Sequence, residues 1–220
     1  MRKWAKEHGL LAANLACFLV FFVGMVLSGA ASYSEDQQAH GEPPVSVLQF
    51  LGTGAFVEAT FENWESEFLQ MAMYVVLTVF LFQKGSSESK PVGKKAPQDE
   101  DPQQAAVSRA TPWPVRRGGA VLKLYENSLS ILLFALFLAS FALHAAGGVD
   151  EYNQDQQSHG QPAITFLQYL GSSRFWFESF QNWQSEFLAV GVLVGASVYL
   201  RQKGSPESKP VAEPHYETGA

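Results

Sequence analysis

Four apolar runs divide the chain into alternating hydrophobic and polar stretches. The runs cover residues 10–31, 68–82, 129–146 and 187–200. The first and third are long enough to cross the hydrocarbon layer of a membrane, which takes about 20 helical residues. The second and fourth are too short alone, so we expect those helices to begin upstream of their runs. The pattern therefore predicts an all-α membrane protein with four transmembrane helices.

The second apolar run carries signals for both ends of a helix. Asn63 is a suitable N-cap, because an asparagine side chain accepts a hydrogen bond from a backbone N–H of the first turn. Glu65 and Glu67 then fall in the first turn, where the helix dipole favours negative charge. Lys84 and Gly85 provide the matching end, with a cation in the last turn and a glycine beyond it. We therefore expect this helix to begin near Asn63.

Three motifs occur twice in the chain, always 119 positions apart. The first copies read Tyr33-x-x-Asp36-Gln-Gln-x-His40-Gly-x-Pro43, Asn63-Trp64-x-Ser-Glu67-Phe-Leu69 and Gln83-Lys-Gly-Ser-x-Glu-Ser-Lys-Pro91, and the second copies begin at Tyr152, Asn182 and Gln202. The repetition predicts two tandem helix–loop–helix units, residues 1–85 and 123–204. Each outer loop is expected to hold a short helix, over residues 45–51 in the first copy.

The two units are separated and followed by polar segments. Residues 86–122 are rich in Ser, Pro, Gln and charge, and such a composition cannot bury enough apolar surface to fold. We predict a disordered linker there and a tail over residues 205–220.

The distribution of cations predicts the orientation of the chain. Lys and Arg lie near the amino terminus, in the linker and in the tail, whereas the two outer loops contain only Arg174. Cytoplasmic segments of membrane proteins are enriched in Lys and Arg. We therefore expect both termini and the linker to be cytoplasmic. The two copies would share one orientation, related by an axis along the membrane normal.

The amino-terminal region also resembles a secretory signal, with a basic start, an apolar run and the small residues Ser28-Gly29-Ala30-Ala31. The run is longer than a typical signal core, however, and its repeat counterpart, residues 129–146, is internal. We expect a retained transmembrane helix.

Composition narrows the functional classes. The net charge of −6 argues against nucleic-acid binding, which needs a basic face. The single cysteine, Cys17, allows no intrachain disulfide. No phosphate-binding loop, nucleophile–base arrangement or zinc-type cysteine spacing occurs, so no enzyme class or cofactor is indicated. The expected partners are the lipid bilayer and, through Gly191-x-x-x-Gly195, a second copy or another membrane protein.

The repeated motifs resemble those of a family of uncharacterised bacterial membrane proteins that share a domain of unknown function. The resemblance covers both halves of the chain. It implies a bacterial inner membrane. In that membrane the orientation predicted from the cations would place the repeated loops in the periplasm or exterior. It implies no activity, substrate or catalytic residue.

The repeated histidines are candidate metal ligands. His40 follows Asp36 by four residues, and His159 follows Asp155 by the same spacing, so two copies could supply four ligands. Gly41 and the proline two residues later favour a loop, however, in which the histidines would hydrogen-bond backbone carbonyls and hold its shape. We favour this structural interpretation.

A second candidate pair is Glu67 and Glu186, because both copies keep an acid where the neighbouring glutamates become glutamines. A carboxylate at the outer edge of a spanning helix could relay protons or bind a cation. The alternative, which we favour, is stabilisation of the helix dipole.

The remaining candidates have simple explanations. Trp64 and Trp183 sit where an aromatic belt at the membrane interface is expected. Asn182 repeats the N-cap role expected of Asn63. His144 is opposite Met25 in the repeat, and a His/Met haem pair is conceivable, although no second helix histidine supports it.

Three functional classes follow. The first, which we favour, is a non-catalytic scaffold, accessory subunit or envelope-stress component. The second is a small transporter or a proton or cation pathway that uses Glu67 and Glu186. The third is an outward-facing metal- or haem-binding enzyme that uses His40 and His159.

Overall fold

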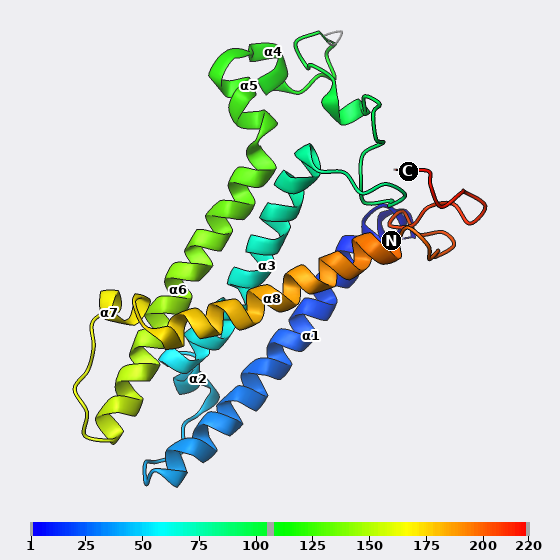
Figure 1. Ribbon diagram of the computed structural model, residues 1–220. Helices are drawn as coiled ribbons and strands as arrows, with labels where there is room; N and C mark the ends of the chain where they lie inside the picture. Colours follow the sequence, from blue (N-terminus) through cyan, green and yellow to red (C-terminus); the bar gives the residue numbers. More distant parts are fainter. Residues whose placement is uncertain (1, 105–107, 219–220) are drawn as a thin grey trace. The chain divides into compact units, whose positions relative to one another are not determined.

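The computed structural model describes residues 2–104 and 108–218 and contains no strand within those ranges (Figure 1). The long helices are α1 (Arg2–Ala39), α3 (Gly54–Phe80), α6 (Ser128–Ser158) and α8 (Ser173–Ala196). The short ones are α2 (Val47–Phe50), η1 (Pro97–Asp99), α4 (Trp113–Arg117), α5 (Gly119–Glu126) and α7 (Phe166–Leu170). The prediction of an all-helical protein is confirmed.

Two helices have the length and hydropathy of a membrane span. Within residues 2–104 and 108–218, the segments that pass this test are Lys6–Ala39 and Ser128–Ser158. Helix α3 has glutamates over its first four turns, so its apolar stretch is short. The sequence pattern therefore predicts two of the four expected spans more strongly than the other two.

The long helices begin upstream of the apolar runs, and α3 and α8 end within theirs, so the expected end of α3 at Lys84 and Gly85 is also wrong. Helix α3 starts at Gly54 and not near Asn63, so the N-cap interpretation of Asn63, and with it that of Asn182 in α8, is wrong. The capping side chains are Thr53 and Ser172, whose hydroxyls accept hydrogen bonds from the backbone N–H groups three residues later, both at 3.2 Å. The first turns of these helices are amphipathic, which is why an apolar-run criterion misses them.

The segment expected to be a disordered linker contains short elements in the structure. Residues 86–104 form turns and η1, and the part after residue 107 forms α4 and the start of α5. Gly118 and Gly119, at the junction of α4 and α5, have φ angles of 67° and 60°. Such angles favour glycine, which explains the pair at this bend. Residues 105–107 lie outside the part of the linker that the structure describes.

The chain forms two compact units. The first comprises residues 1–61 and 142–175, and the second comprises residues 62–141 and 176–220. The first unit thus holds the outer-loop part of both sequence copies. Helices α3, α6 and α8 each begin in one unit and continue into the other.

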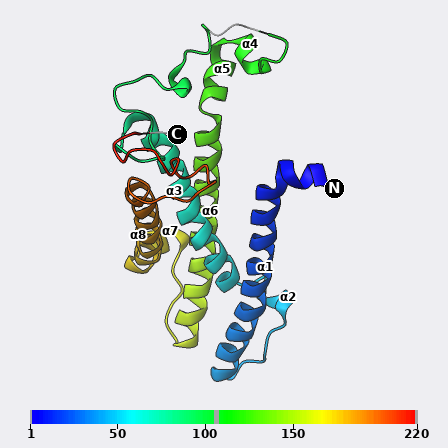
Figure 2. The same ribbon diagram turned by 90° about the vertical axis from the view of Figure 1, so that its right-hand side faces the viewer.

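In the first unit, the short helix of each copy packs an aromatic ring on a glycine of the preceding long helix. Phe50 of α2 covers Gly29 of α1, where an added Cβ would lie 2.8 Å from the ring Cζ. Tyr169 of α7 covers Gly148 of α6 in the same way, and Figure 2 shows α2 beside α1. Both short helices begin with a capping box. It is formed by Ser46 and Gln49 in the first copy and by Thr165 and Gln168 in the second.

The Asp-Gln-Gln-x-His-Gly-x-Pro motif ends a long helix in both copies. In α1 the N–H of Glu42 bonds the carbonyl of Gln37 at 2.9 Å, and Gly41 has a φ of 83°. In α6 the N–H of Gln161 bonds the carbonyl of Gln156 at 2.7 Å. This is the Schellman arrangement, in which a left-handed glycine closes the helix and a proline follows.

The Gln-Lys-Gly-Ser-x-Glu-Ser-Lys-Pro motif forms the same turn twice in the second unit. The hydroxyl of Ser89 accepts a hydrogen bond from the N–H of Gln83 at 3.0 Å, and Ser208 accepts one from Gln202 at 2.9 Å. Ser86, in the first of these turns, shares a 2.6 Å hydrogen bond with Ser197 at the end of α8. The repeated residues thus fold alike in both copies.

Candidate functional site

The predicted histidine candidates lie at exposed helix ends. Nδ1 of His40 lies 2.9 Å from the carbonyl oxygen of Asp36, and His159 makes the same contact with Asp155 at 2.9 Å. The corresponding carboxylates lie 3.8 and 3.5 Å from Nδ1. Asp36, His40 and Asp155 line one cavity of about 300 Å³ in the first unit, whose lining does not include His159. Three of the four predicted ligands therefore line one cavity, and the fourth, His159, contacts Asp155.

Glu67 and Glu186 lie in the second unit, the first exposed and the second half-buried. Their charges are close enough to interact.

The predicted aromatic and asparagine residues also lie on α3 and α8. Trp64 is half-buried on α3. Trp183 packs its ring against Phe137 and donates its indole N–H to Glu65 at 2.8 Å. Asn182 donates to Glu62.

Helix α3 carries a polar residue at every fourth position, which the sequence reasoning missed. We call this row the α3 stripe; it consists of Glu58, Glu62, Ser66, Gln70, Tyr74 and Thr78, together with Glu65 beside Ser66. Residues four apart are neighbours on a helix surface, about 5–6 Å apart at Cβ. The signal was available as a period of four, but Glu58 and Glu62 precede the helix start expected near Asn63.

The middle of the α3 stripe is buried. Glu65 has no exposed surface, Ser66 is 2 % exposed and Gln70 is 6 % exposed. At the far end the hydroxyl of Tyr74 donates to the carboxylate of Glu88 at 2.9 Å. The polar row therefore continues through helix α3 from its first turns to the turn that follows it.

Helix α8 lies along the stripe within the second unit. Its Asn182 and Trp183 meet the stripe at Glu62 and Glu65. Further along, Gly191 and Gly195 line a groove of about 480 Å³ with Tyr74. The glycines of the Gly-x-x-x-Gly pattern therefore face α3, where their missing side chains leave the groove open.

A second polar group lies where α3 and α6 approach each other in the first unit. An added Cβ on Gly54 would lie 2.7 Å from the carbonyl oxygen of Gly147, so only glycine permits this approach. It brings Glu58 close to His144, which is fully buried. The ring of His144 lies against Phe175 at 4.9 Å between centroids.

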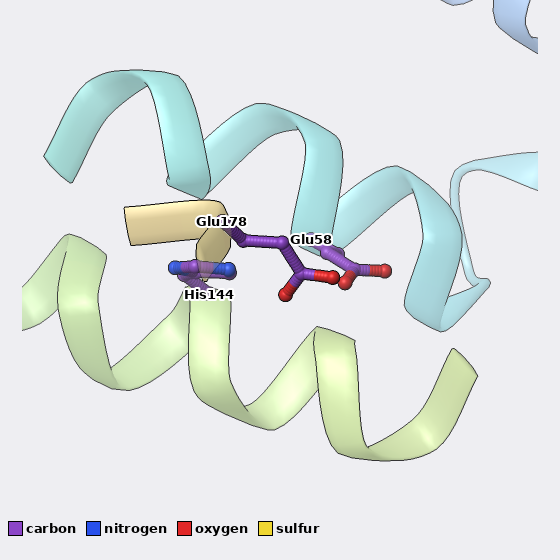
Figure 3. Close-up of side chains that lie close together, drawn as sticks. All are labelled: Glu58, His144 and Glu178. Atoms are coloured by element: carbon purple, nitrogen blue, oxygen red, sulfur yellow. The ribbon is translucent and has the colours of Figure 1, made fainter. Parts of the chain in front are cut away.

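Figure 3 shows the side chains of Glu58 and His144, which both belong to the first unit. The potential ligand atoms of these two residues lie within 4.8 Å of each other.

The repeat concealed the pair of Glu58 and His144 from sequence reasoning. Their counterparts are Phe177 and Met25, so neither residue is kept in the other copy. The comparison of copies selects residues with a shared structural role. A site that combines one residue from each copy gives no such signal, because neither residue is repeated. Only the spatial arrangement shows it.

Comparison with known proteins identifies the family of the chain. No curated protein and no solved structure matches it. A family profile described as a domain of unknown function, DUF6766, matches residues 1–220. The match extends over both sequence copies and agrees with the predicted resemblance to a family of unknown function. The chain therefore belongs to the DUF6766 family.

Proposed function

We propose that the protein is an integral membrane protein of four transmembrane helices that conducts protons along the α3 stripe. The observation that carries this proposal is the buried middle of the stripe, with a carboxylate at Glu65 and polar side chains on either side of it. Ionisable residues within a membrane are rare and usually functional, because an unused charge there is costly.

The lengths of the helices support four spans. Helices α1 and α6 have the length and hydropathy of spans. Helix α3, with 27 residues, and helix α8, with 24, would measure about 40 and 36 Å at about 1.5 Å per residue, enough to cross the hydrocarbon layer. The distribution of cations supports cytoplasmic termini in a bacterial inner membrane, with the repeated loops outside.

The partners of Glu62 and Glu65 support a functional role for the acids. Both side chains accept hydrogen bonds from α8, so each acid has a polar partner on that helix. The second copy carries Gln181 and Gln184 at the equivalent positions. Because an amide also accepts these bonds, packing alone does not require an acid at Glu65.

The inner end of the stripe supports an exit for protons. Tyr74 and Thr78 line a cavity of about 620 Å³ together with Glu88 and Lys90. Glu88 accepts the hydrogen bond of Tyr74, so it can receive a proton from the stripe. This cavity lies between the last turns of α3 and the segment that follows the helix, which would face the cytoplasm.

The test is proton flux into liposomes that contain the purified full-length protein and a pH-sensitive dye. A potassium gradient with valinomycin drives the flux. The protein should acidify the vesicle interior faster than empty vesicles do. Gln70→Leu removes the polar group from the centre of the stripe and should reduce this flux, whereas Met71→Leu, at its exposed neighbour, should not. Equal flux in wild-type and empty vesicles would contradict the proposal.

A second candidate is the non-catalytic scaffold, favoured by the identical local structures of the repeated motifs. In that case the acids of the stripe hold α3 against α8 by hydrogen bonds, as polar residues do in membrane bundles. Replacement of glutamate by glutamine separates the candidates, because the amide keeps the hydrogen bond and cannot exchange a proton in the same way. A scaffold would have no flux to lose.

A further inference from the structure

We propose that the groove between α3 and α8 binds one molecule of phosphatidylethanolamine, with an acyl chain in the groove and the headgroup in the cavity at the inner end of α3. All residues of this site belong to the second unit. The inference rests on the proposed placement of α3 and α8 in the membrane, and it does not depend on proton conduction.

The groove suits a hydrocarbon chain. Its volume is about 480 Å³, and the apolar side chains that line it are Leu77, Leu81, Phe82, Phe187, Val190 and Val194. Gly191 and Gly195 complete the lining, and an added Cβ on either would meet no neighbouring atom within 4 Å. Lipid tails are as apolar as leucine side chains. The walls of the groove therefore match an acyl chain in polarity.

The volume of the groove favours an acyl chain over a second helix. An α-helix with its side chains is about 10–12 Å across and rises about 5.4 Å per turn. A volume of about 480 Å³ would therefore hold only about one turn of a helix. An acyl chain is a single file of methylene groups and can follow a groove of this size. We therefore assign a lipid to the groove, in place of the second copy that the Gly-x-x-x-Gly pattern predicts.

A polar cavity adjoins the groove at the inner end of α3. This cavity, of about 620 Å³, shares four lining residues with the groove, among them Tyr74 and Glu88. Lys90 lines the cavity, and its Nζ lies 5.8 Å from the ring centroid of Phe82 in the groove. The apolar groove therefore lies beside charged groups, as the acyl chain of a phospholipid lies beside its headgroup.

The charges of the cavity match a headgroup that carries both a phosphate and an ammonium. Lys90 donates to Asp99 and, with three N–H donors, can also donate to a phosphate. Glu88 accepts the hydrogen bond of Tyr74, and a carboxylate has about four acceptor positions, so it can also accept from an ammonium.

Other common headgroups fit these charges less well. The quaternary ammonium of phosphatidylcholine has no N–H to donate to Glu88. The headgroup of phosphatidylglycerol is anionic and would meet two carboxylates, Glu88 and Asp99, with Lys90 as the cation of the lining. Charge complementarity therefore selects phosphatidylethanolamine.

The experiment measures phospholipid binding to the full-length protein in detergent by native mass spectrometry, with the same acyl chains on each lipid. We expect one bound phosphatidylethanolamine. Phosphatidylcholine and phosphatidylglycerol should bind about tenfold more weakly, because each lacks a charge-assisted hydrogen bond. Gly195→Leu fills the groove and should abolish the bound lipid. Glu88→Gln keeps an acceptor for Tyr74 and should remove the preference over phosphatidylcholine.

The matched control is Gly24→Leu on α1, where an added Cβ also meets no neighbouring atom within 4 Å. It should bind phosphatidylethanolamine as wild type does. The comparison of lipids on wild type needs no variant. The proposal is overturned if wild type binds no phospholipid, if phosphatidylglycerol binds as tightly as phosphatidylethanolamine, or if Gly195→Leu retains the lipid.

A second copy in the groove is another outcome that would overturn the proposal. Wild type would then form lipid-free dimers that Gly195→Leu dissociates. Lipid binding is measured in detergent and proton flux in liposomes, so either proposal can fail while the other holds.

Discussion

Single glycines determine how the short helices dock on the long ones. At Gly29 and Gly148 an aromatic side chain from the next element occupies the space of a Cβ. The ring of Phe50 is itself held between Tyr33 and Phe56, at centroid distances of 5.7 and 5.6 Å. It therefore cannot move aside freely when the glycine gains a side chain.

We predict that Gly29→Ala destabilises the protein by about 1–3 kcal/mol, the usual cost of overpacking. Gly24→Ala is the matched control, because it lies on the same helix with open space around the added Cβ. It should be neutral or slightly stabilising, since alanine favours helices by about 1 kcal/mol. Unfolding in denaturing detergent measures both, and equal effects at the two sites would contradict the account.

An exposed ion pair in the linker gives a pH-dependent prediction. Lys90 donates to the carboxylate of Asp99 at 2.6 Å, and this hydrogen bond, with a second from the Ala96 N–H, lowers the pKa of Asp99. Because the folded pKa is the lower one, the stabilisation is present above the ordinary aspartate pKa and is lost as pH falls through the folded pKa.

We predict that Lys90→Met raises the pKa of Asp99, measured by carboxyl NMR titration. Lys94→Met, at an exposed neighbouring lysine without a hydrogen bond to Asp99, should change it much less. A pKa of Asp99 that is the same in both variants would show that the ion pair does not form in solution.

At the scale of elements, the repeat and the apolar runs predicted the number and order of the long helices. They did not predict where α3 and α8 begin. An apolar run marks the part of a helix that faces lipid or a core. The N-cap residue lies a few turns before that run, and the run gives no information about it. Thr53 and Ser172 were therefore missed, and Asn63 was wrongly chosen.

We predict that Thr53→Ala lowers stability by about 1 kcal/mol, the usual cost of removing an N-cap. Thr53→Ser keeps the accepting oxygen and should retain most of the stability. Thermal unfolding followed by circular dichroism compares the two variants, and an equal loss in both would contradict the capping role.

The same comparison of copies that revealed the architecture concealed the candidate site. Residues kept twice, such as His40 and His159, serve helix ends in the structure. Residues present once, such as Glu58, Glu65 and His144, form the polar groups inside the two units, and the last two are fully buried. Sequence alone could not join them, because their proximity depends on packing between segments about 80 to 120 positions apart.

At the scale of the molecule, the positions of the cations predict the orientation of the repeats. We predict that cysteines at Ala39 and Ser158, which are exposed and equivalent in the two copies, react with a membrane-impermeant reagent in intact spheroplasts. A cysteine at Ser108 in the linker should not react. The assay uses a Cys17→Ser background, because the native cysteine is exposed. Labelling at residue 108 but not at residues 39 and 158 would show that the chain has the opposite orientation.

Proton conduction along the α3 stripe requires Glu65 to exchange protons. The most direct measurement is the proton flux of Glu65→Gln in the same liposomes as wild type, with Glu67→Gln as the exposed control. We predict that the Glu65→Gln protein folds and that its flux falls to that of empty vesicles, while Glu67→Gln conducts as wild type does. Wild-type flux in a folded Glu65→Gln protein would contradict it.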